Sequence, residues 1–247
     1  MGGSELRRKF VDGVISQTDK DYLQHLLQYQ RCVEQRNRLL KQFYEDRVFD
    51  EASLQVWDDQ LVLHGTSILL RRRSFIAEFI HIFADYFHDI AGQSEQPTLQ
   101  YVSKLEGDDV ATLFADKLVE ARQRDKYAQY TTVGPHRDDI ELMVDGMLVR
   151  RFGSQGQQKT FLLALKLAQF EYIFRQRGVK PILLLDDIFD KLDMLRVKQL
   201  IHLVGSDRFG QVLLSDTQPG RVQAIFDEMP SVDHSIFNVV KGTIARG

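Results

Sequence analysis

The 247-residue sequence is poor in several features that would otherwise direct a fold. It has one cysteine and five prolines, and no apolar run approaches the length that spans a bilayer. The lone Cys32 cannot form an internal disulfide, and no cysteine–histidine cluster has the spacing of zinc ligands. These absences exclude a disulfide-stapled domain, a zinc-stabilised domain and a membrane-spanning protein, and they favour a cytoplasmic location.

Charge and composition give no global preference for a partner. The net charge is -3, with 43% hydrophobic and 27% charged residues, which is close to the average of globular proteins. Such a chain should fold, and binding to nucleic acid or anionic lipid would have to come from local basic patches. The length suits one globular body with a subdomain.

Two long stretches early in the chain repeat apolar residues at helical spacing. The first runs from Asp19, a suitable N-cap, to Arg47, and the second from about Leu54 to Phe87. A loop at Ala91 to Pro97 follows, after which strands and helices alternate. We therefore expect a helical hairpin subdomain at residues 1–97 and an α/β part at residues 98–247.

The α/β part is read from short apolar runs, helical spacing and turn residues. Strands are predicted at residues 99–102, 131–133, 139–144, 147–149, 181–185 and 212–215, and helices at 108–127, 155–177, 195–204 and after Pro219. The pair Asp145-Gly146 predicts a tight hairpin turn. Apolar strands that alternate with helices favour a parallel sheet packed by helices, and hence an α/β fold.

The run Pro181-Ile-Leu-Leu-Leu-Asp186-Asp187 is an apolar strand that ends in two carboxylates. Open α/β sheets present functional groups at the carboxyl ends of their strands. In a nucleotide-hydrolysing site Asp186 would hold Mg²⁺ through water, and Asp187 would orient or deprotonate the attacking water. A solvated strand end is the alternative, but the residues through Asp190 and Asp193 continue with the spacing of the D-loop that follows Walker B in ABC-type ATPases.

The run Phe152-Gly-Ser-Gln-Gly-Gln-Gln-Lys-Thr160 nearly satisfies the phosphate-loop pattern G-x-x-x-x-G-K-[ST]. Gln158 occupies the place of the second glycine, where a side chain would fill the space that the backbone needs to close around phosphates. We therefore reject a phosphate loop here. Ser154 instead predicts the N-cap of a long helix, and Gln157 completes a capping box.

The same loop has the features of a signature loop. Backbone N–H groups, the Ser154 hydroxyl and the positive end of the helix dipole point at any anion that docks there, and a γ-phosphate fits that description. An ordinary capped helix explains the capping box equally well. The order of the two motifs, with one helix and one turn between the loop and Asp186, matches an ABC-type lobe.

Several stretches together resemble the RecF family of bacterial recombination and repair ATPases. They are Gly134-Pro-His-Arg-Asp-Asp139, Arg151-Phe-Gly-Ser-Gln-Gly-Gln-Gln158, Leu183-Leu-Leu-Asp-Asp187, Arg7-Arg-Lys-Phe-Val-Asp12, Tyr29 to Gln42 and Trp57-Asp-Asp-Gln-Leu61. The resemblance covers nearly the whole chain. The family's N-terminal strand, Walker A loop and following helix have no counterpart in this sequence, so we expect a fragment or shortened form.

The resemblance implies a partial SMC-like ABC ATPase head that binds ATP and Mg²⁺ between two protomers and clamps DNA at gaps or strand junctions as an ATP-dependent homodimer. RecF-family members work with RecO and RecR to load RecA. By position, the residues that contact the partner's ATP would be Ser154, Gln155, Gly156 and Gln157, and the D-loop would span Asp190 to Asp193. Both cofactors would require the Walker A region, so the chain alone should be a weak or inactive ATPase.

Two positions depart from the family pattern. Asp187 stands where most ABC proteins have a glutamate, and its shorter arm favours slow hydrolysis. Asp216 stands where many relatives carry a switch histidine, and a carboxylate cannot donate a ring proton to the γ-phosphate. It could instead hold water or a residue of the partner.

Basic residues gather at several places: Arg7 to Lys9, Arg31 to Lys41, Arg71 to Arg73, Arg122 to Lys126 and Arg150-Arg151. Contact with DNA phosphates is one explanation, and solvated helix faces are the better one for any single cluster. The strongest DNA candidates are Arg71, Arg72 and Arg73, because three adjacent arginines cannot share one side of a helix. We expect His136 and Arg137 to be structural in a Gly-Pro turn, although Arg137 could face nucleotide or DNA.

Two other classes remain open. One is a non-catalytic module that binds DNA or RecR, in which the α/β part is a scaffold. The other is a different SMC-like ATPase, which would need long coiled-coil arms that neither helical stretch supplies.

Overall fold

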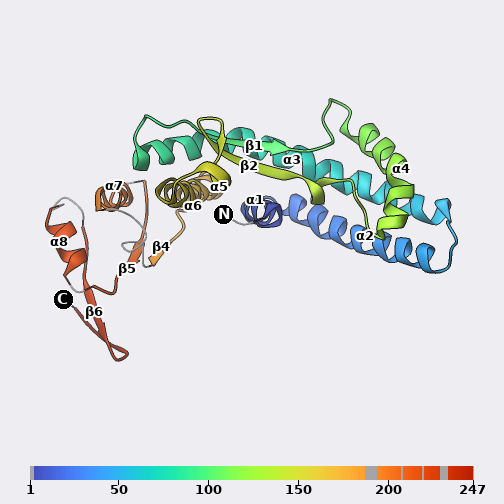
Figure 1. The fold of residues 1–247 in the computed structure, drawn as a ribbon. Helices are drawn as coiled ribbons and strands as arrows, with labels where there is room; N and C mark the ends of the chain where they lie inside the picture. The colour runs from blue at the N-terminus through green and yellow to red at the C-terminus, as the bar shows by residue number, and fades with distance from the viewer. Residues whose placement is uncertain (1–2, 187–193, 207, 219, 229–232, 247) are drawn as a thin grey trace. The chain divides into compact units, whose positions relative to one another are not determined.

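The computed structural model describes residues 3–186, 194–206, 208–218, 220–228 and 233–246 (Figure 1). These residues form two compact units, Met1–His81 with Thr98–Met143 and Ile82–Pro97 with Val144–Gly247. These residue ranges differ from the expected single division at residue 97, because residues 98–143 belong with the helices of the first unit. The predicted subdomain limits depended on sequence continuity alone, whereas the units are interleaved along the chain.

The first unit is mainly helical. It contains α1 (Ser4–Thr18), α2 (Lys20–Glu45), the first part of α3 (Glu51–Ala91) and α4 (Val110–Ala128). Asp19 caps α2 by accepting the Tyr22 N–H at 2.9 Å, and Asp109 caps α4 by accepting the Thr112 N–H at 3.1 Å. The predicted helices at residues 19–47, 54–87 and 108–127 are therefore confirmed to within a few residues at each end.

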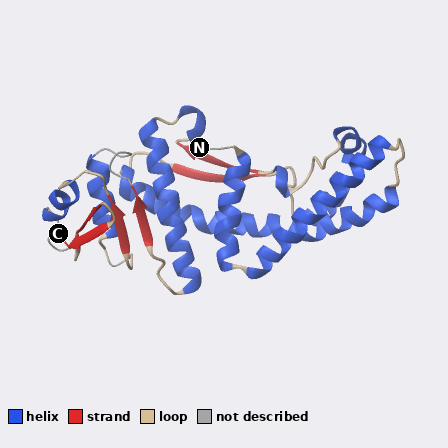
Figure 2. Cartoon of the chain, turned by 90° about the horizontal axis from the view of Figure 1, so that it is seen from below, coloured by secondary structure: helices blue, strands red, loops and turns tan. Residues whose placement is uncertain are grey.

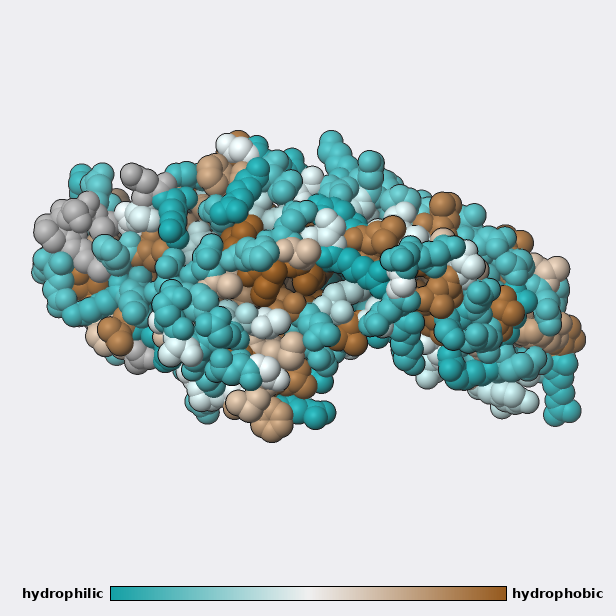
Figure 3. Space-filling model, turned by 90° about the horizontal axis from the view of Figure 1, so that it is seen from above, coloured by the Kyte–Doolittle hydropathy of each residue, from teal (hydrophilic) through white to brown (hydrophobic). Residues whose placement is uncertain are grey.

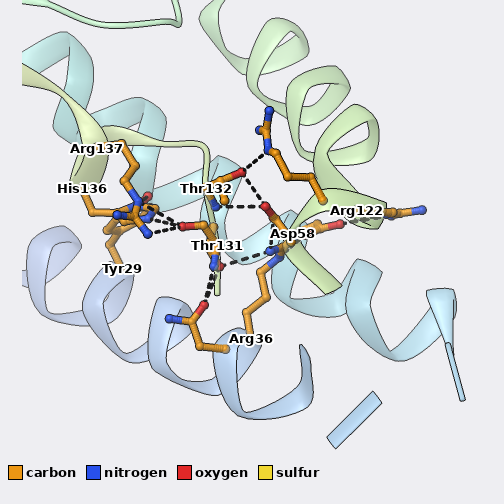
Figure 4. A network of polar contacts seen from close by, with 11 residues as sticks. Tyr29, Arg36, Asp58, Arg122, Thr131, Thr132, His136 and Arg137 are labelled. Carbon is orange, nitrogen blue, oxygen red and sulfur yellow. Dashed lines mark hydrogen bonds and ion pairs between the residues drawn. The ribbon is translucent and has the colours of Figure 1, made fainter. Parts of the chain in front are cut away.

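A cluster of buried polar side chains holds α2, α3 and α4 of the first unit together (Figure 4). Arg36 is 0% exposed, and its guanidinium donates to Asp58 Oδ1 at 2.7 Å and to Asp125 Oδ2 at 2.6 Å. Two carboxylates around one buried cation compensate its desolvation. Removing Arg36 would leave the buried carboxylates of Asp58 and Asp125 without the cation that they share, so this cluster fixes how the three helices pack.

The same cluster explains why the predicted strand at residues 131–133 is wrong. The Thr131 N–H donates to Asn37 Oδ1 at 2.7 Å, and the Thr132 N–H donates to Asp125 Oδ1 at 3.0 Å. Side chains from α2 and α4 thus take the hydrogen bonds that a neighbouring strand would otherwise provide. The segment leads into a short 3₁₀ turn, η1 (Pro135–Arg137), without forming a strand.

The described strands form three small sheets. In the first, β1 (Pro97–Val102), β2 (Asp139–Val144) and β3 (Met147–Leu148) lie in the order β1-β2-β3. Asp145 and Gly146 between β2 and β3 have φ values of 50° and 76°, as the predicted hairpin turn requires. The strand predicted to end at residue 149 stops earlier, because α5 (Val149–Phe152) begins there.

The second unit combines the end of α3 with a parallel strand pair and further helices. These helices are α6 (Gln155–Arg177), α7 (Met194–Val204) and α8 (Arg221–Asp227), and the strands β4 (Leu183–Asp186) and β5 (Val212–Ser215) pair in parallel. Phe161 of α6 packs against Phe83 of α3, with ring centroids 4.6 Å apart. The elements predicted at residues 155–177, 181–185, 195–204 and 212–215 are confirmed with small shifts, as is the mixed α/β class (Figure 2).

An antiparallel hairpin of β6 (Phe237–Val240) and β7 (Thr243–Arg246) was not predicted. Within the described ranges, no helix is both long and apolar enough to cross a membrane. On the face shown in Figure 3, hydrophobic residues lie in separate patches among hydrophilic ones.

Candidate functional site

The start of α6 carries the loop that the sequence marks as a signature loop. The Ser154 hydroxyl accepts the Gln157 N–H at 3.1 Å, and the Gln157 side-chain oxygen accepts the Ser154 N–H at 2.8 Å. Both halves of the predicted capping box are therefore present. Ser154 and Gln155 are exposed, so this end of α6 faces solvent with the N–H groups and dipole that suit an anion.

Gln158, the residue that breaks the phosphate-loop pattern, folds back across the loop. Its side-chain nitrogen donates to the Gly153 carbonyl at 2.9 Å. Gly153 itself has no room for a side chain, because a Cβ there would lie 2.7 Å from the Val149 carbonyl oxygen. The loop thus closes on its own atoms, which agrees with rejecting a phosphate-wrapping role.

Gln157 differs from the neighbouring loop residues in how its side chain is used. Its oxygen caps Ser154, and its nitrogen donates to Glu95 Oε1 at 2.7 Å. Both ends of the amide therefore bond within the chain. This geometry does not favour the predicted direct contact between the Gln157 side chain and ATP, and it leaves Ser154, Gln155 and the backbone at Gly156 as the outward-facing groups.

Arg196, near the start of α7, lies beside the loop. A Cβ on Gly156 would be 2.9 Å from its Nη1 atom, so glycine leaves the space that the guanidinium occupies. Sequence reasoning did not identify Arg196 or Glu95. No local pattern could have done so, since both reach the loop from distant parts of the chain.

Asp186 ends β4 and lies opposite Ser215, which ends β5. The Ser215 hydroxyl donates to Asp186 Oδ1, and both residues are exposed. The predicted strand ending in a carboxylate at the sheet edge is thus present. Asp187, Asp190 and Asp193 lie outside the described residues, so their predicted catalytic and D-loop roles stay predictions.

Asp216, at the predicted switch position, is paired within the chain. Its carboxylate accepts from Arg221 Nε at 2.7 Å, and only 1% of its side chain is exposed. The hydrogen bond from Arg221 lowers the pKa of Asp216 below its ordinary value, so the carboxylate is charged at neutral pH. Asp216 therefore bonds to Arg221 of its own chain, whereas the sequence suggested that it could hold water or a residue of the second protomer.

The three arginines predicted to bind DNA point to three different intramolecular partners. Arg71 Nε pairs with Asp19 Oδ2 at 2.9 Å, and Arg73 Nη2 donates to the Leu105 carbonyl at 2.5 Å. Arg72 is 3% exposed and donates through Nε and Nη2 to both oxygens of one carboxylate, that of Asp12. Arg72 is therefore a core residue, and the geometry corrects its assignment to a DNA surface.

His136 and Arg137 both bond within the Gly-Pro turn, as expected, and Arg137 is also exposed. His136 Nε2 lies 3.0 Å from the Thr131 carbonyl oxygen and its Nδ1 lies 2.7 Å from the Tyr29 hydroxyl (Figure 4). The Arg137 guanidinium donates to the same carbonyl and lies over the Tyr130 ring at 4.7 Å from its centroid. The Gly-Pro turn is thereby tied to α2 and to the end of α4.

No three histidine, cysteine, aspartate or glutamate side chains in the described part of the chain converge as metal ligands would. Asp186 offers a hard oxygen donor of the kind that binds Mg²⁺ through water. The exposed start of α6 offers N–H groups suited to a phosphate. The residues present therefore fit the parts of an ATP·Mg²⁺ site that this chain would contribute.

A helix with a signature-type loop, followed by a strand that ends in Asp186 beside a parallel neighbour, is the arrangement of part of an ABC-type ATPase head, here with a largely helical unit. The chain is 46% identical over 237 residues to the DNA replication and repair protein RecF of Flavobacterium johnsoniae. The matched residues make up 96% of this chain and 65% of the relative. The chain is 43% identical over 243 residues to the protein of the same name from Parabacteroides distasonis. The chain belongs to the RecF family, as its motifs predicted.

The fold agrees with this assignment. A solved structure of the recombination mediator protein RecF-ATPrS in the RecFOR pathway superposes with a TM-score of 0.82 and 26% identity, over 99% of this chain and 64% of that one. No family model matches the chain. The chain spans about 65% of the length of the curated relatives it matches.

Proposed function

We propose that this chain forms part of a RecF-type DNA repair and recombination ATPase, in which the α6 loop closes on ATP held by a second protomer. The capping box at Ser154 is the observation that carries the proposal. It shapes an exposed helix start whose N–H groups and dipole suit a γ-phosphate. The similarity to a solved structure of RecF-ATPrS supports a role for ATP.

Within this proposal Ser154, Gln155 and the backbone at Gly156 contact the nucleotide, and Gln157 shapes the loop. Asp186 holds Mg²⁺ through water, with its carboxylate oriented by Ser215. Asp187 orients the attacking water, and residues 190–193 form the D-loop between protomers. Mg²⁺ would neutralise charge on the phosphates when bound.

The assembly that we propose is an ATP-dependent homodimer that binds DNA at gaps or strand junctions. It would work with RecO and RecR to load RecA, in line with the RecFOR pathway of the solved neighbour. Hydrolysis by the assembly would be slow, and the ATP grip would require the part of the relatives that this chain does not match. A non-catalytic module that binds DNA or RecR is the second candidate.

The test uses a chimera in which this chain replaces the matched residues of the Flavobacterium johnsoniae protein. We expect ATP to drive dimerisation, measured by sedimentation velocity. Ser154→Arg should abolish the dimer while the monomer stays folded, because a bulky side chain would block the docked phosphate and remove the Ser154 cap. Ser74→Arg, at an exposed serine of α3, is the matched control. An unchanged dimer in the Ser154→Arg chimera would remove the loop from the mechanism.

A further inference from the structure

The side chain of Gln157 is held at both ends, and one of these ends depends on a residue outside the loop. Its oxygen accepts the Ser154 N–H at 2.8 Å, and its nitrogen donates to Glu95 Oε1 at 2.7 Å. A carboxylate can only accept hydrogen bonds. Glu95 therefore forces the nitrogen of the amide toward itself and the oxygen toward Ser154.

Glu95 is itself held in place by the surrounding chain of the second unit. Its carbonyl oxygen lies 3.0 Å from Nε2 of His88, in the last turn of α3. The next residue, Gln96, donates its N–H to Asp145 Oδ1 and accepts the Asp145 N–H, each at 2.9 Å. The carboxylate thus stands on a segment fixed to α3 on one side and to the β2–β3 turn on the other.

We propose that Glu95 is a positioning residue for the α6 loop. Its carboxylate orients Gln157, Gln157 caps the Ser154 N–H, and the loop keeps the shape in which Ser154 and Gln155 face outward. Without Glu95 the amide is free to reverse or to turn to solvent, and the cap on Ser154 is lost for part of the time. The consequence for ATP rests on the proposed function, whereas the consequence for the loop does not.

Amide hydrogen exchange of this chain, resolved by NMR at the Ser154 N–H, tests the loop. Glu95→Ala should speed exchange at Ser154 by about fivefold, the loss expected for one partly exposed charge-assisted hydrogen bond. Gln157→Glu should also speed it, because two carboxylates then face each other. The control is Glu106→Gln, at an exposed glutamate of the first unit, and it should change nothing.

The decisive variant exchanges the two groups. In Glu95→Gln/Gln157→Glu, the new carboxylate accepts both the Ser154 N–H and the amide of residue 95, so the same atoms are bridged in the opposite sense. We expect exchange at Ser154 to return to within about twofold of the original rate. If exchange at Ser154 in the double variant stays as fast as in Gln157→Glu alone, the side chain at position 95 does not act through residue 157 and the proposal is wrong.

ATP-dependent dimerisation of the chimera distinguishes the role of Glu95 in shaping the α6 loop from the proposed role of that loop in binding ATP. The same variants should weaken the dimer in the order set by exchange, with the double variant restored. Altered exchange with unaltered dimerisation would contradict the proposed role of the loop and leave the role of Glu95 in shaping it. Unaltered exchange in Glu95→Ala would overturn the role of Glu95 whatever the dimer does.

Discussion

His136 shows how one partly buried side chain links segments that are far apart in the sequence. Its Nε2 lies against the Thr131 carbonyl oxygen, so Nε2 must carry the proton, and Nδ1 then accepts the Tyr29 hydroxyl. Burial lowers the pKa of His136 to about 4. The neutral ring is therefore the form that ties the Gly-Pro turn to α2.

This arrangement predicts a pH dependence of stability. A histidine with a lowered pKa binds fewer protons in the folded than in the unfolded chain between the two pKa values. The free energy of unfolding should therefore be constant above about pH 6.5 and fall toward pH 4, with a slope that approaches about 1.4 kcal/mol per pH unit from this group. Urea unfolding from pH 4 to 7 measures it. His136→Gln should lose this slope relative to the exposed-site control His202→Gln, and a retained slope would assign it elsewhere.

At the residue scale, the sequence predicted contacts between residues that are close together along the chain. The pairing of Ser154 with Gln157 follows from residues three apart in one helix start, and it was predicted and is confirmed. The partners of Arg71 and Arg72 lie 52 and 60 positions away, and that of Gln157 lies 62 positions away. Such partners depend on how helices pack, which a single sequence does not reveal.

At the scale of elements, the crossing of α2, α3 and α4 depends on a glycine within a helix. A Cβ on Gly65 would lie 2.6 Å from Phe114 Cε1 of α4 and 2.9 Å from Tyr29 Cε2 of α2. Glycine in a helix interior costs about 1 kcal/mol relative to alanine. Its presence in α3 therefore reflects close packing and not helix propensity.

Alanine substitutions at two helical glycines separate these effects. Gly65→Ala should lower the free energy of unfolding by about 1–3 kcal/mol, because buried rings must move and overpacking outweighs the gain in propensity. Gly13→Ala in α1, where no other group lies within 4 Å of the added Cβ, should raise it by up to about 1 kcal/mol. Urea unfolding followed by far-UV circular dichroism measures both. Stabilisation by Gly65→Ala would show that the three helices are not tightly packed there.

Two segments were predicted incorrectly, each for its own physical reason. The strand predicted at residues 131–133 is replaced by irregular chain because side chains of α2 and α4 satisfy its backbone. The β6–β7 hairpin was not predicted because its residues lack a strict alternation of apolar and polar side chains. All four residues of each strand are exposed. Periodicity predicts elements that bury one face, and neither strand of this hairpin does so.

At the scale of the whole molecule, the family and fold class were predictable because the motifs occur in a fixed order along the chain. The assignment of Arg71 to Arg73 to a DNA surface did not anticipate that all three bond to partners within the chain. The basic residues from Arg31 to Lys41 differ from one another in burial. Arg36 is buried, while Arg31, Arg38 and Lys41 are exposed and have no ion-pair partner within the described ranges.

These three residues lie on one side of α2, since at about 100° per residue they fall within about 80° around the helix axis. Glu34 and Glu45 lie on the same face and offset two of its three positive charges, so the face keeps a net charge of +1. It is therefore a better candidate for contact with DNA phosphates than Arg71 to Arg73. The alternative of a non-catalytic binding module is tested most directly here, because it requires this face of α2 to bind DNA without ATP.

If this face of α2 contacts DNA, Arg31→Ala/Arg38→Ala/Lys41→Ala should weaken binding to a gapped duplex measured by fluorescence anisotropy without ATP. Each lost phosphate contact should lower the slope of log affinity against log salt by about 0.7–0.9, so the triple variant should lose up to about 2–3. The matched control is Lys9→Ala/Lys117→Ala/Lys198→Ala, which removes the same charge from three lysines that are ion-paired to Glu5, Glu120 and Glu228. Equal slopes for the two triple variants would mean that net charge, and not this face of α2, governs the affinity for DNA.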